Sequence, residues 1–223
     1  MKRRGFLGLM AGAPFFATSV ASAQEAVSAT PIAGIDAGRA ALLVMDYQPA
    51  WISTLTDSDP LLERAAQAIA VARERGVRVA YCRVAFTPAD DAAVPDGNII
   101  FTQLVQRPGG LNDGAPDLDI DRRVAPEPGE KVIRKTRVGA FTRTDLDGWL
   151  RGLGIDTLIL AGISTSGVVL STVCDAADRD YRLYVLADAC ADRNPDIQDV
   201  LINDVFPQRA QVITVADLPE LLG

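Results

Sequence analysis

The stretch TLILAGISTSGVVLSTVCDAA spans residues 157–177 and joins three local patterns in direct succession. Residues 157–161 are almost continuously apolar, over a length typical of a strand that is buried on both faces. A turn of small residues follows at 162–167, and apolar side chains then recur at helical spacing up to residue 177. A buried strand that passes through a short turn into an amphipathic helix indicates one unit of a parallel α/β sheet.

Similar units lie on both sides of this stretch. Other apolar runs of strand length occur at 41–45, 77–84, 131–134, 182–187 and 211–215. Other segments with helical periodicity occur at 59–76, 144–154 and 197–205. We therefore predict an α/β fold with a mostly parallel open sheet that is covered by helices on both faces.

The composition excludes several classes of function. The 223 residues are 48% hydrophobic, which is enough apolar material for the core of one domain. Asp and Glu outnumber Lys and Arg by 29 to 22, so the net charge is −7 and we expect no nucleic-acid partner. The sequence contains no histidine, which excludes Ser-His-Asp triads, Cys-His pairs and histidine-ligated metals. We expect neither a metal nor another cofactor.

The first 23 residues have the pattern of a signal peptide. A positive head at residues 2–4 precedes an uncharged run from 5 to 23, which ends in the cleavage pattern Ala21-Ser22-Ala23. The run is nearly long enough for a membrane anchor, but glycine, proline and hydroxyl residues dilute it, so we expect no stable anchor after cleavage. Arg3-Arg4 and the following Gly-Phe-Leu resemble the twin-arginine export motif.

Cleavage after Ala23 defines the predicted mature protein. It removes three positive charges and no negative ones, which changes the net charge from −7 to −10. Residues 24–39 are rich in small and hydroxyl side chains and are interpreted as a linker, so the folded domain is predicted at 40–223. We predict a periplasmic or secreted protein, exported by the twin-arginine route.

Three cysteines, Cys82, Cys174 and Cys190, remain in the predicted mature chain. An odd number allows at most one disulfide within the chain, and the sequence leaves open whether any pair forms it. Each cysteine lies in an apolar stretch, which favours a buried structural role.

Candidate functional residues follow the ends of the predicted strands, where open α/β sheets bind their ligands. Asp46 follows the strand at 41–45, Lys135 follows the strand at 131–134, and the turn at 162–168 opens a helix. Each has a simpler interpretation, as a turn former, a solvated lysine or a tight connection. Lysine is scarce, however, with three lysines against 19 arginines, which favours a role such as proton exchange. The long segment at 86–130 is expected to shape the pocket.

Three ordered motifs together resemble the isochorismatase-like (cysteine hydrolase) family. Residues 43–48, LVMDYQ, resemble its opening strand. Lys135, with GAF at 139–141 and TDL at 144–146, resembles its lysine motif. Residues 154–172 resemble its nucleophile segment, and the likeness extends over about residues 40–215.

The resemblance implies a fold and a site. The fold is a Rossmann-like three-layer α/β/α sandwich, and the protein is expected to be a homo-oligomer that acts on a small molecule. Asp46 would be the acid/base, and Lys135 would neutralise or orient it. A non-proline cis peptide is expected at Ile163–Ser164. The expected oxyanion turn and pocket consist of Ile163, Ser164, Gly167 and Val168, with Gln48, Phe141 and Thr165 lining the pocket.

One position departs from the family pattern, because Val168 stands where the family has its nucleophilic cysteine. Cys174 lies almost two helical turns further on, ~9 Å along the helix, and cannot substitute for it. Ser164, Thr165 and Ser166 lack a histidine base that would activate a hydroxyl. Some family members that hydrolyse vinyl ethers also lack the cysteine.

We therefore predict a hydrolase that uses Asp46 and Lys135 in non-covalent acid/base chemistry, since a positioned carboxylic acid suffices for such a reaction. The alternative is a catalytically degenerate homologue that binds a small molecule without turning it over. Loss of the nucleophile favours this second interpretation, whereas retention of Asp46 and Lys135 favours the enzyme.

Overall fold

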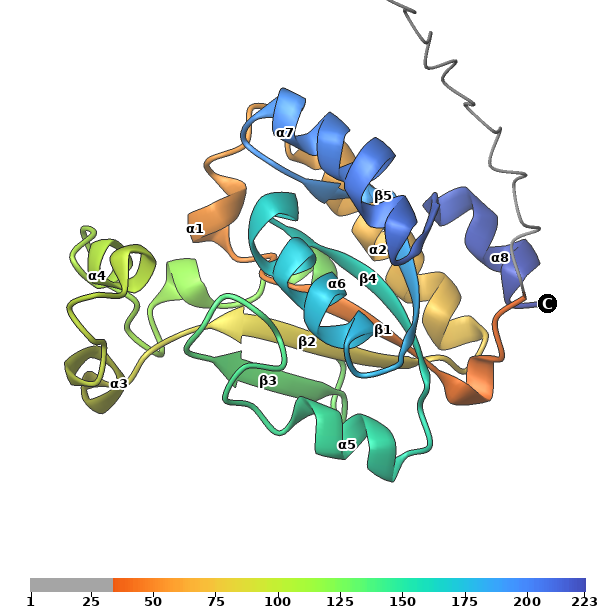
Figure 1. Ribbon diagram of the computed structural model, residues 1–223, viewed down its shortest axis with the longest axis horizontal. Helices are drawn as coiled ribbons and strands as arrows, with labels where there is room; N and C mark the ends of the chain where they lie inside the picture. The colour runs from red at the N-terminus through yellow and green to blue at the C-terminus, as the bar shows by residue number, and fades with distance from the viewer. Residues whose placement is uncertain (1–33) are drawn as a thin grey trace, which may run out of the picture. The chain divides into compact units, whose positions relative to one another are not determined.

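A six-stranded parallel sheet forms the centre of the protein, as the computed structural model in Figure 1 shows for residues 34–223, the part that it describes. The strand order is β3-β2-β1-β4-β5-β6, and every neighbouring pair is parallel. The strands are β1 (Ala40–Met45), β2 (Arg78–Val84), β3 (Lys131–Lys135), β4 (Thr157–Ile163), β5 (Arg182–Ala191) and β6 (Gln211–Ile213). The predicted parallel sheet is confirmed.

Helices cover both faces of the sheet. They are α1 (Pro49–Ile52), α2 (Asp59–Glu74), α3 (Pro88–Ala92), α4 (Ile99–Val105), α5 (Leu146–Gly152), α6 (Leu170–Ala177), α7 (Pro195–Val200) and α8 (Leu218–Leu221). Successive side chains of β1 point to opposite faces, so Leu42 packs in one core with α2 and α8, whereas Leu43 packs in another with α5 and α6. These two cores make the predicted three-layer α/β/α sandwich (Figure 1).

The two central strands show why the apolar runs were informative. Every residue of β1 and of β4 is buried, because each strand has neighbours on both sides and helices on both faces. Strand β5 is longer than the predicted run at 182–187. Its pairing with β4 shifts register between Leu160 and Gly162 and then continues to Ala191. Strand β6 ends before the predicted residue 215, because Thr214 begins a capping box with Asp217.

The long segment between β2 and β3 carries α3, α4 and a small core of its own. Phe86 stacks on Phe101 with ring centroids 5.6 Å apart, next to the buried Leu111 and Leu118. An ion pair of 2.6 Å between Arg83 of β2 and Asp113 joins this segment to the sheet. The segment is therefore a packed cap at the carboxyl ends of the strands.

The chain joins the domain before the predicted boundary at residue 40. Ile35 is buried, and its backbone N–H donates to the carbonyl of Leu221 at 2.7 Å. Residues 35–39 of the predicted linker thus pack on the domain. The predicted signal peptide at 1–23, and the linker up to residue 33, lie outside the described residues. Within residues 34–223, no helix has the length and apolar character needed to span a membrane.

All three cysteines are free thiols. Cys82 and Cys190 are buried, as predicted, whereas Cys174 on α6 is partly exposed. Its predicted burial is wrong, because the helix has a solvent-facing side that the apolar stretch did not reveal.

Candidate active site

A cavity of about 440 Å³ opens at the carboxyl ends of the central strands. It lies where the strand order reverses between β1 and β4, the position at which doubly wound sheets bind ligands. Its apolar walls include Trp51, Leu55, Ile100, Phe101, Leu104 and Val138. Three of these, Ile100, Phe101 and Leu104, come from the segment at 86–130, so the prediction that this segment shapes the pocket is confirmed.

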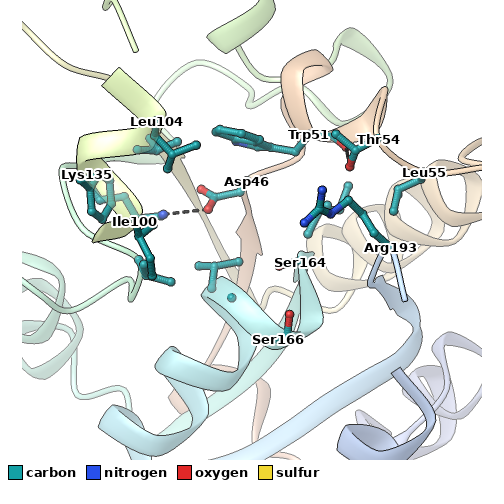
Figure 2. A pocket seen from close by; sticks show the side chains of 16 residues that line it. Asp46, Trp51, Thr54, Leu55, Ile100, Leu104, Lys135, Ser164, Ser166 and Arg193 are labelled. Atoms are coloured by element: carbon teal, nitrogen blue, oxygen red, sulfur yellow. Dashed lines mark hydrogen bonds and ion pairs between the residues drawn. The ribbon is translucent and has the colours of Figure 1, made fainter. Parts of the chain in front are cut away.

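Asp46 lines the cavity directly after β1. Its backbone N–H donates to the Cys82 carbonyl at 2.9 Å, which continues the strand pairing for one residue. Its φ angle is +58°, a left-handed conformation that Asp tolerates better than most residues and that occurs often at functional sites. The turn directs the carboxyl group toward the cavity (Figure 2).

Lys135 is the last residue of β3 and is almost fully buried. Its Nζ lies 2.7 Å from Asp46 Oδ2, and it also donates to the Arg137 carbonyl at 3.2 Å. The predicted pairing of Asp46 and Lys135 at one edge of the sheet is confirmed (Figure 2). Asp46 Oδ1 is buried and has no hydrogen-bond partner among the described residues. One oxygen is therefore held by Lys135, and the other is available to a ligand.

Burial dominates the electrostatics of Asp46. Desolvation raises the pKa of its carboxyl group to about 6, although the charge and hydrogen bond of Lys135 act in the opposite direction. Burial also raises the pKa of the Cys82 and Cys190 thiols to about 12. Asp46 can therefore give or take a proton near neutral pH, whereas these two thiols stay protonated.

The turn after β4 forms the floor beside Asp46. The Ile163–Ser164 peptide is cis, as predicted. Residues Thr165–Val169 make one π-helical turn that leads into α6. Val168 lies in this turn, is buried and lines the cavity together with Ile163, Ser164 and Gly167. The four residues of the predicted turn are thus brought to the cavity.

Gln48 does not line the cavity, which corrects the prediction. Its side chain is completely buried and holds neighbouring segments together. Its Oε1 accepts from the backbone N–H of Val84 at 2.9 Å and from Trp51 Nε1 at 3.1 Å. Its Nε2 donates to the carbonyls of Val84 and Leu118. All its polar atoms serve the fold, so none is left for a ligand.

Phe141 and Thr165 are also absent from the cavity lining, and both predictions are corrected. Phe141 packs in the core on the α5 and α6 side, where its ring lies 5.8 Å from that of Tyr181. Thr165 is the first residue of the π-helical turn and is fully buried, and its hydroxyl has no partner among the described residues. Nearness in sequence to Asp46, to Lys135 or to the turn was therefore a poor guide to side-chain direction.

Several lining residues were missed by the sequence analysis. Trp51, Thr54 and Leu55 follow β1 by a few residues, and Arg193 follows β5. The only available signal for Arg193 was its place after a strand, at the same edge of the sheet as Asp46. Within residues 34–223, no three Cys, Asp or Glu side chains are grouped so that they could hold a metal ion.

The chain is similar to known proteins over most of its length. The model of the isochorismatase domain family matches residues 40–217. A ureidoacrylate amidohydrolase from Methylorubrum extorquens is 34% identical over 186 residues, which cover 74% of this chain and 74% of the relative. A maleamate amidohydrolase from Pseudomonas putida is 29% identical over 190 residues, which cover 82% of this chain and 86% of the relative.

Solved structures share the fold. An isochorismatase family protein from Desulfovibrio vulgaris has a TM-score of 0.73 and 27% sequence identity, with coverage of 82% of this chain and 98% of that protein.

Proposed function

Because the chain belongs to the isochorismatase family of hydrolases, we propose that it hydrolyses a small molecule by acid/base chemistry without a covalent enzyme intermediate. The observation that carries this proposal is the Asp46 carboxyl group, whose pKa is raised to about 6 at the wall of an apolar cavity. An acid with a pKa near the working pH can donate a proton in the transition state and be reprotonated in the next cycle.

Val168 supports a mechanism without a thiolate. By resemblance, it occupies the position of the family's nucleophilic cysteine, in the turn that follows the cis peptide. No cysteine lines the cavity among residues 34–223. The Ser166 hydroxyl lines the cavity but donates to Asp192, whose pKa lies below its usual range because Ser166 stabilises the carboxylate against the raising effect of burial. Such a carboxylate is a weak base for activating a serine.

A vinyl ether is a substrate class that suits these groups. Asp46 transfers its proton to the terminal carbon of the C=C bond, and the carbon attached to oxygen becomes an oxocarbenium ion. Water adds to that carbon and returns one proton to the Asp46 carboxylate. The resulting hemiketal breaks its C–O bond to release an alcohol and a carbonyl compound. The net reaction consumes one water, and the carboxyl group is regenerated.

Lys135 determines which Asp46 oxygen carries the proton. Its ammonium group donates to Oδ2, so the transferable proton resides on Oδ1, the atom without a protein partner. When Asp46 becomes anionic after proton transfer, the same ammonium group lies 2.7 Å away and stabilises the charge. Lys135 therefore acts on both states of the acid.

A binding protein without turnover is the second candidate, and the valine at position 168 is the observation that favours it. Both candidates use the same cavity, but only the enzyme requires a proton on Asp46. Substitution of Asp46 by Asn keeps the size of the side chain and removes the acid, so it separates the two.

The test is turnover of a panel of small vinyl ethers, both neutral and carboxylate-bearing, followed by release of the carbonyl product. Asp46→Asn is expected to lower the rate by about 10²–10⁴-fold, the usual contribution of one general acid. Asp178→Asn, at an exposed residue after α6, is the matched control and should not change it. Treatment of the wild type with iodoacetamide should leave the rate unchanged, because the mechanism uses no thiol.

Three results would contradict the proposal: no turnover by the wild type, full turnover by Asp46→Asn, or loss of turnover after alkylation. The first would favour the binding protein. The last would require a thiol mechanism, with Cys174 as the partly exposed candidate.

A further inference from the structure

Arg193 lines the cavity from the side opposite the ion pair of Asp46 and Lys135. It lies two residues beyond the end of β5, and its side chain is exposed to solvent at the cavity mouth. Figure 2 shows its guanidinium group extending from the β5 side toward Asp46, with Thr54, Leu55 and Ser164 nearby. The function proposed above gives this residue no role.

The charges in the cavity do not balance. Asp46, Lys135 and Arg193 are the charged residues among those that line it. When Asp46 is ionised, it neutralises Lys135 at 2.7 Å, and when it carries its proton, the charge of Lys135 remains. In either state the Arg193 guanidinium is an additional positive charge. The cavity is thus positive in a protein whose net charge is −7.

The guanidinium group of Arg193 has no ion pair or side-chain hydrogen bond with any of residues 34–223 in this structure. The nearest acid along the chain, Asp192, is already engaged, because it accepts from the backbone N–H of Ser166 at 2.9 Å and from that of Asn194 at 3.2 Å. Elsewhere, arginines such as Arg73 and Arg123 are held by carboxylates at 2.8 and 2.7 Å. An unpaired guanidinium that points into a cavity has its hydrogen-bond donors free for a ligand.

We propose that Arg193 binds a carboxylate of the substrate and that this enzyme therefore acts on small organic acids with an apolar body. A guanidinium group is planar and presents two parallel N–H donors, which match the two oxygens of a carboxylate. The rest of the cavity lining consists largely of apolar side chains, including Trp51, Ile163 and Val168, which suit a hydrocarbon portion.

This assignment rests on the proposed function for the orientation of the substrate. A carboxylate held at Arg193 places the other end of a small molecule toward Asp46, where the proton is delivered. Arg193 is thus a specificity-determining and positioning residue, whereas Asp46 is the catalytic acid. The positive cavity also attracts an anion to a protein whose net negative charge repels it elsewhere.

The experiment compares pairs of probes that differ only in charge. The pairs are crotonate, benzoate, phenylacetate and cinnamate, each with its primary amide, and their affinities for the full chain are measured by titration calorimetry. We expect at least one acid to bind about tenfold or more tightly than its amide. Arg193→Gln should remove that preference by lowering the affinity for the acid and not that for the amide. Arg193→Lys should retain part of the preference, since a lysine keeps the positive charge but lacks the two parallel N–H donors.

Arg182→Gln is the matched control, because Arg182 is exposed at the other end of β5 and its loss changes the net charge equally. It should leave the ratio of acid to amide affinity unchanged. Equal affinity for acid and amide in every pair, absence of binding by every acid, or an unchanged preference in Arg193→Gln would each overturn the assignment.

The titrations together with the vinyl ether turnover assay distinguish this inference from the proposed function. Asp46→Asn should keep the preference for acids while losing turnover, because the two residues act on different parts of the substrate. An acid preference that depends on Arg193, together with no turnover of any vinyl ether, would refute the reaction and leave the carboxylate site standing. Turnover that depends on Asp46 but not on Arg193 would refute the carboxylate site and leave the proposed reaction standing.

Discussion

Asp46 shows how one residue acquires its chemistry from burial. Its carboxyl group follows the fully buried strand β1, so it leaves water when the sheet forms. Lys135 lies 2.7 Å away and favours the charged form, yet the pKa is raised to about 6. Desolvation therefore outweighs the attraction of the lysine, as is common for buried ion pairs. In a surface pair with the same geometry, the carboxyl pKa would be lowered instead. That carboxyl group would be ionised near neutral pH and could not act as a general acid.

The raised pKa of Asp46 predicts how activity depends on pH. A general acid works only when it is protonated, so kcat/KM should be highest below pH 6 and fall by about tenfold per pH unit well above it. The measurement is the pH profile of vinyl ether hydrolysis on the enzyme. A rate that rises with pH through this range would mean that Asp46 acts as a base or that another group limits the reaction.

Removal of Lys135 should shift that profile in a defined direction. The lysine lowers the pKa of Asp46 by charge and by hydrogen bonding, so Lys135→Met is expected to move the falling limb to higher pH. Methionine keeps an unbranched apolar side chain in the buried position. The rate at low pH should fall as well, because the proton is no longer directed to Oδ1. If the rate of Lys135→Met fell at the same pH as that of the wild type, the ion pair would not determine the pKa of Asp46.

At the scale of single elements, Gln48 connects β2 to the long segment between β2 and β3, because its side chain forms hydrogen bonds with both. Gln48→Leu fills similar space but removes the acceptor of Val84 N–H and Trp51 Nε1, both of which then lose a partner. We expect the free energy of unfolding to fall by about 2–4 kcal/mol, from more than one unsatisfied buried group. Urea denaturation measures this, and Gln67→Leu on the exposed side of α2 should change it by no more than about 0.5 kcal/mol. Wild-type stability in Gln48→Leu would contradict the structural role.

Gly162 sets the contact between β4 and β1. A Cβ added there would meet the Met45 carbonyl oxygen at 3.0 Å and Val169 Cγ2 at 3.1 Å. The Met45 carbonyl belongs to the peptide that leads into Asp46, so Gly162→Ala should displace the acid. We expect lower kcat/KM and a loss of about 1–3 kcal/mol in stability, the usual cost of overpacking.

The control for Gly162 is Gly148→Ala on the exposed face of α5, where an added Cβ meets nothing within 4 Å. That substitution should stabilise the protein by about 0.5–1 kcal/mol and leave turnover unchanged. Equal behaviour of the two variants would show that the close approach at Gly162 is unimportant.

Elements were predictable where their signal is local, and the site was predictable only where strand ends imply it. Strands β1 and β4 are continuous apolar runs, and Asp46 and Lys135 follow strands that end at one edge of the sheet. Trp51, Ile100 and Arg193 reach the cavity through packing between distant segments, which no periodicity records. Gln48 was misplaced because its position beside Asp46 says nothing of the backbone groups that surround its amide.

The whole molecule combines a net negative charge with a cavity that carries an unpaired arginine. A net charge of −7 keeps anionic macromolecules away, while a small acid can still be attracted at short range. Assembly into a homo-oligomer, expected from the family resemblance, stays a prediction. Export stays a proposal as well, and it would make the mature protein more acidic, with a net charge of −10 after loss of the three positive residues 2–4.

The proposed export has a specific molecular outcome, a mature chain that begins at Gln24. Ala21-Ser22-Ala23 is the small-x-small pattern that follows the apolar run, and cleavage there precedes Ile35, the first buried residue described in the domain. The cut therefore leaves intact the hydrogen bond from Ile35 to Leu221, and the thermal midpoint of residues 24–223 should equal that of the full chain.

Mass spectrometry of the protein from the periplasmic or secreted fraction of a Gram-negative host should give the mass of a chain that begins at Gln24. Substitution of Arg3 and Arg4 by lysine should leave an uncleaved precursor, because the export motif depends on the arginine pair. An intact Met1 terminus in the exported fraction, or normal processing of the double-lysine variant, would refute the proposed leader or its route.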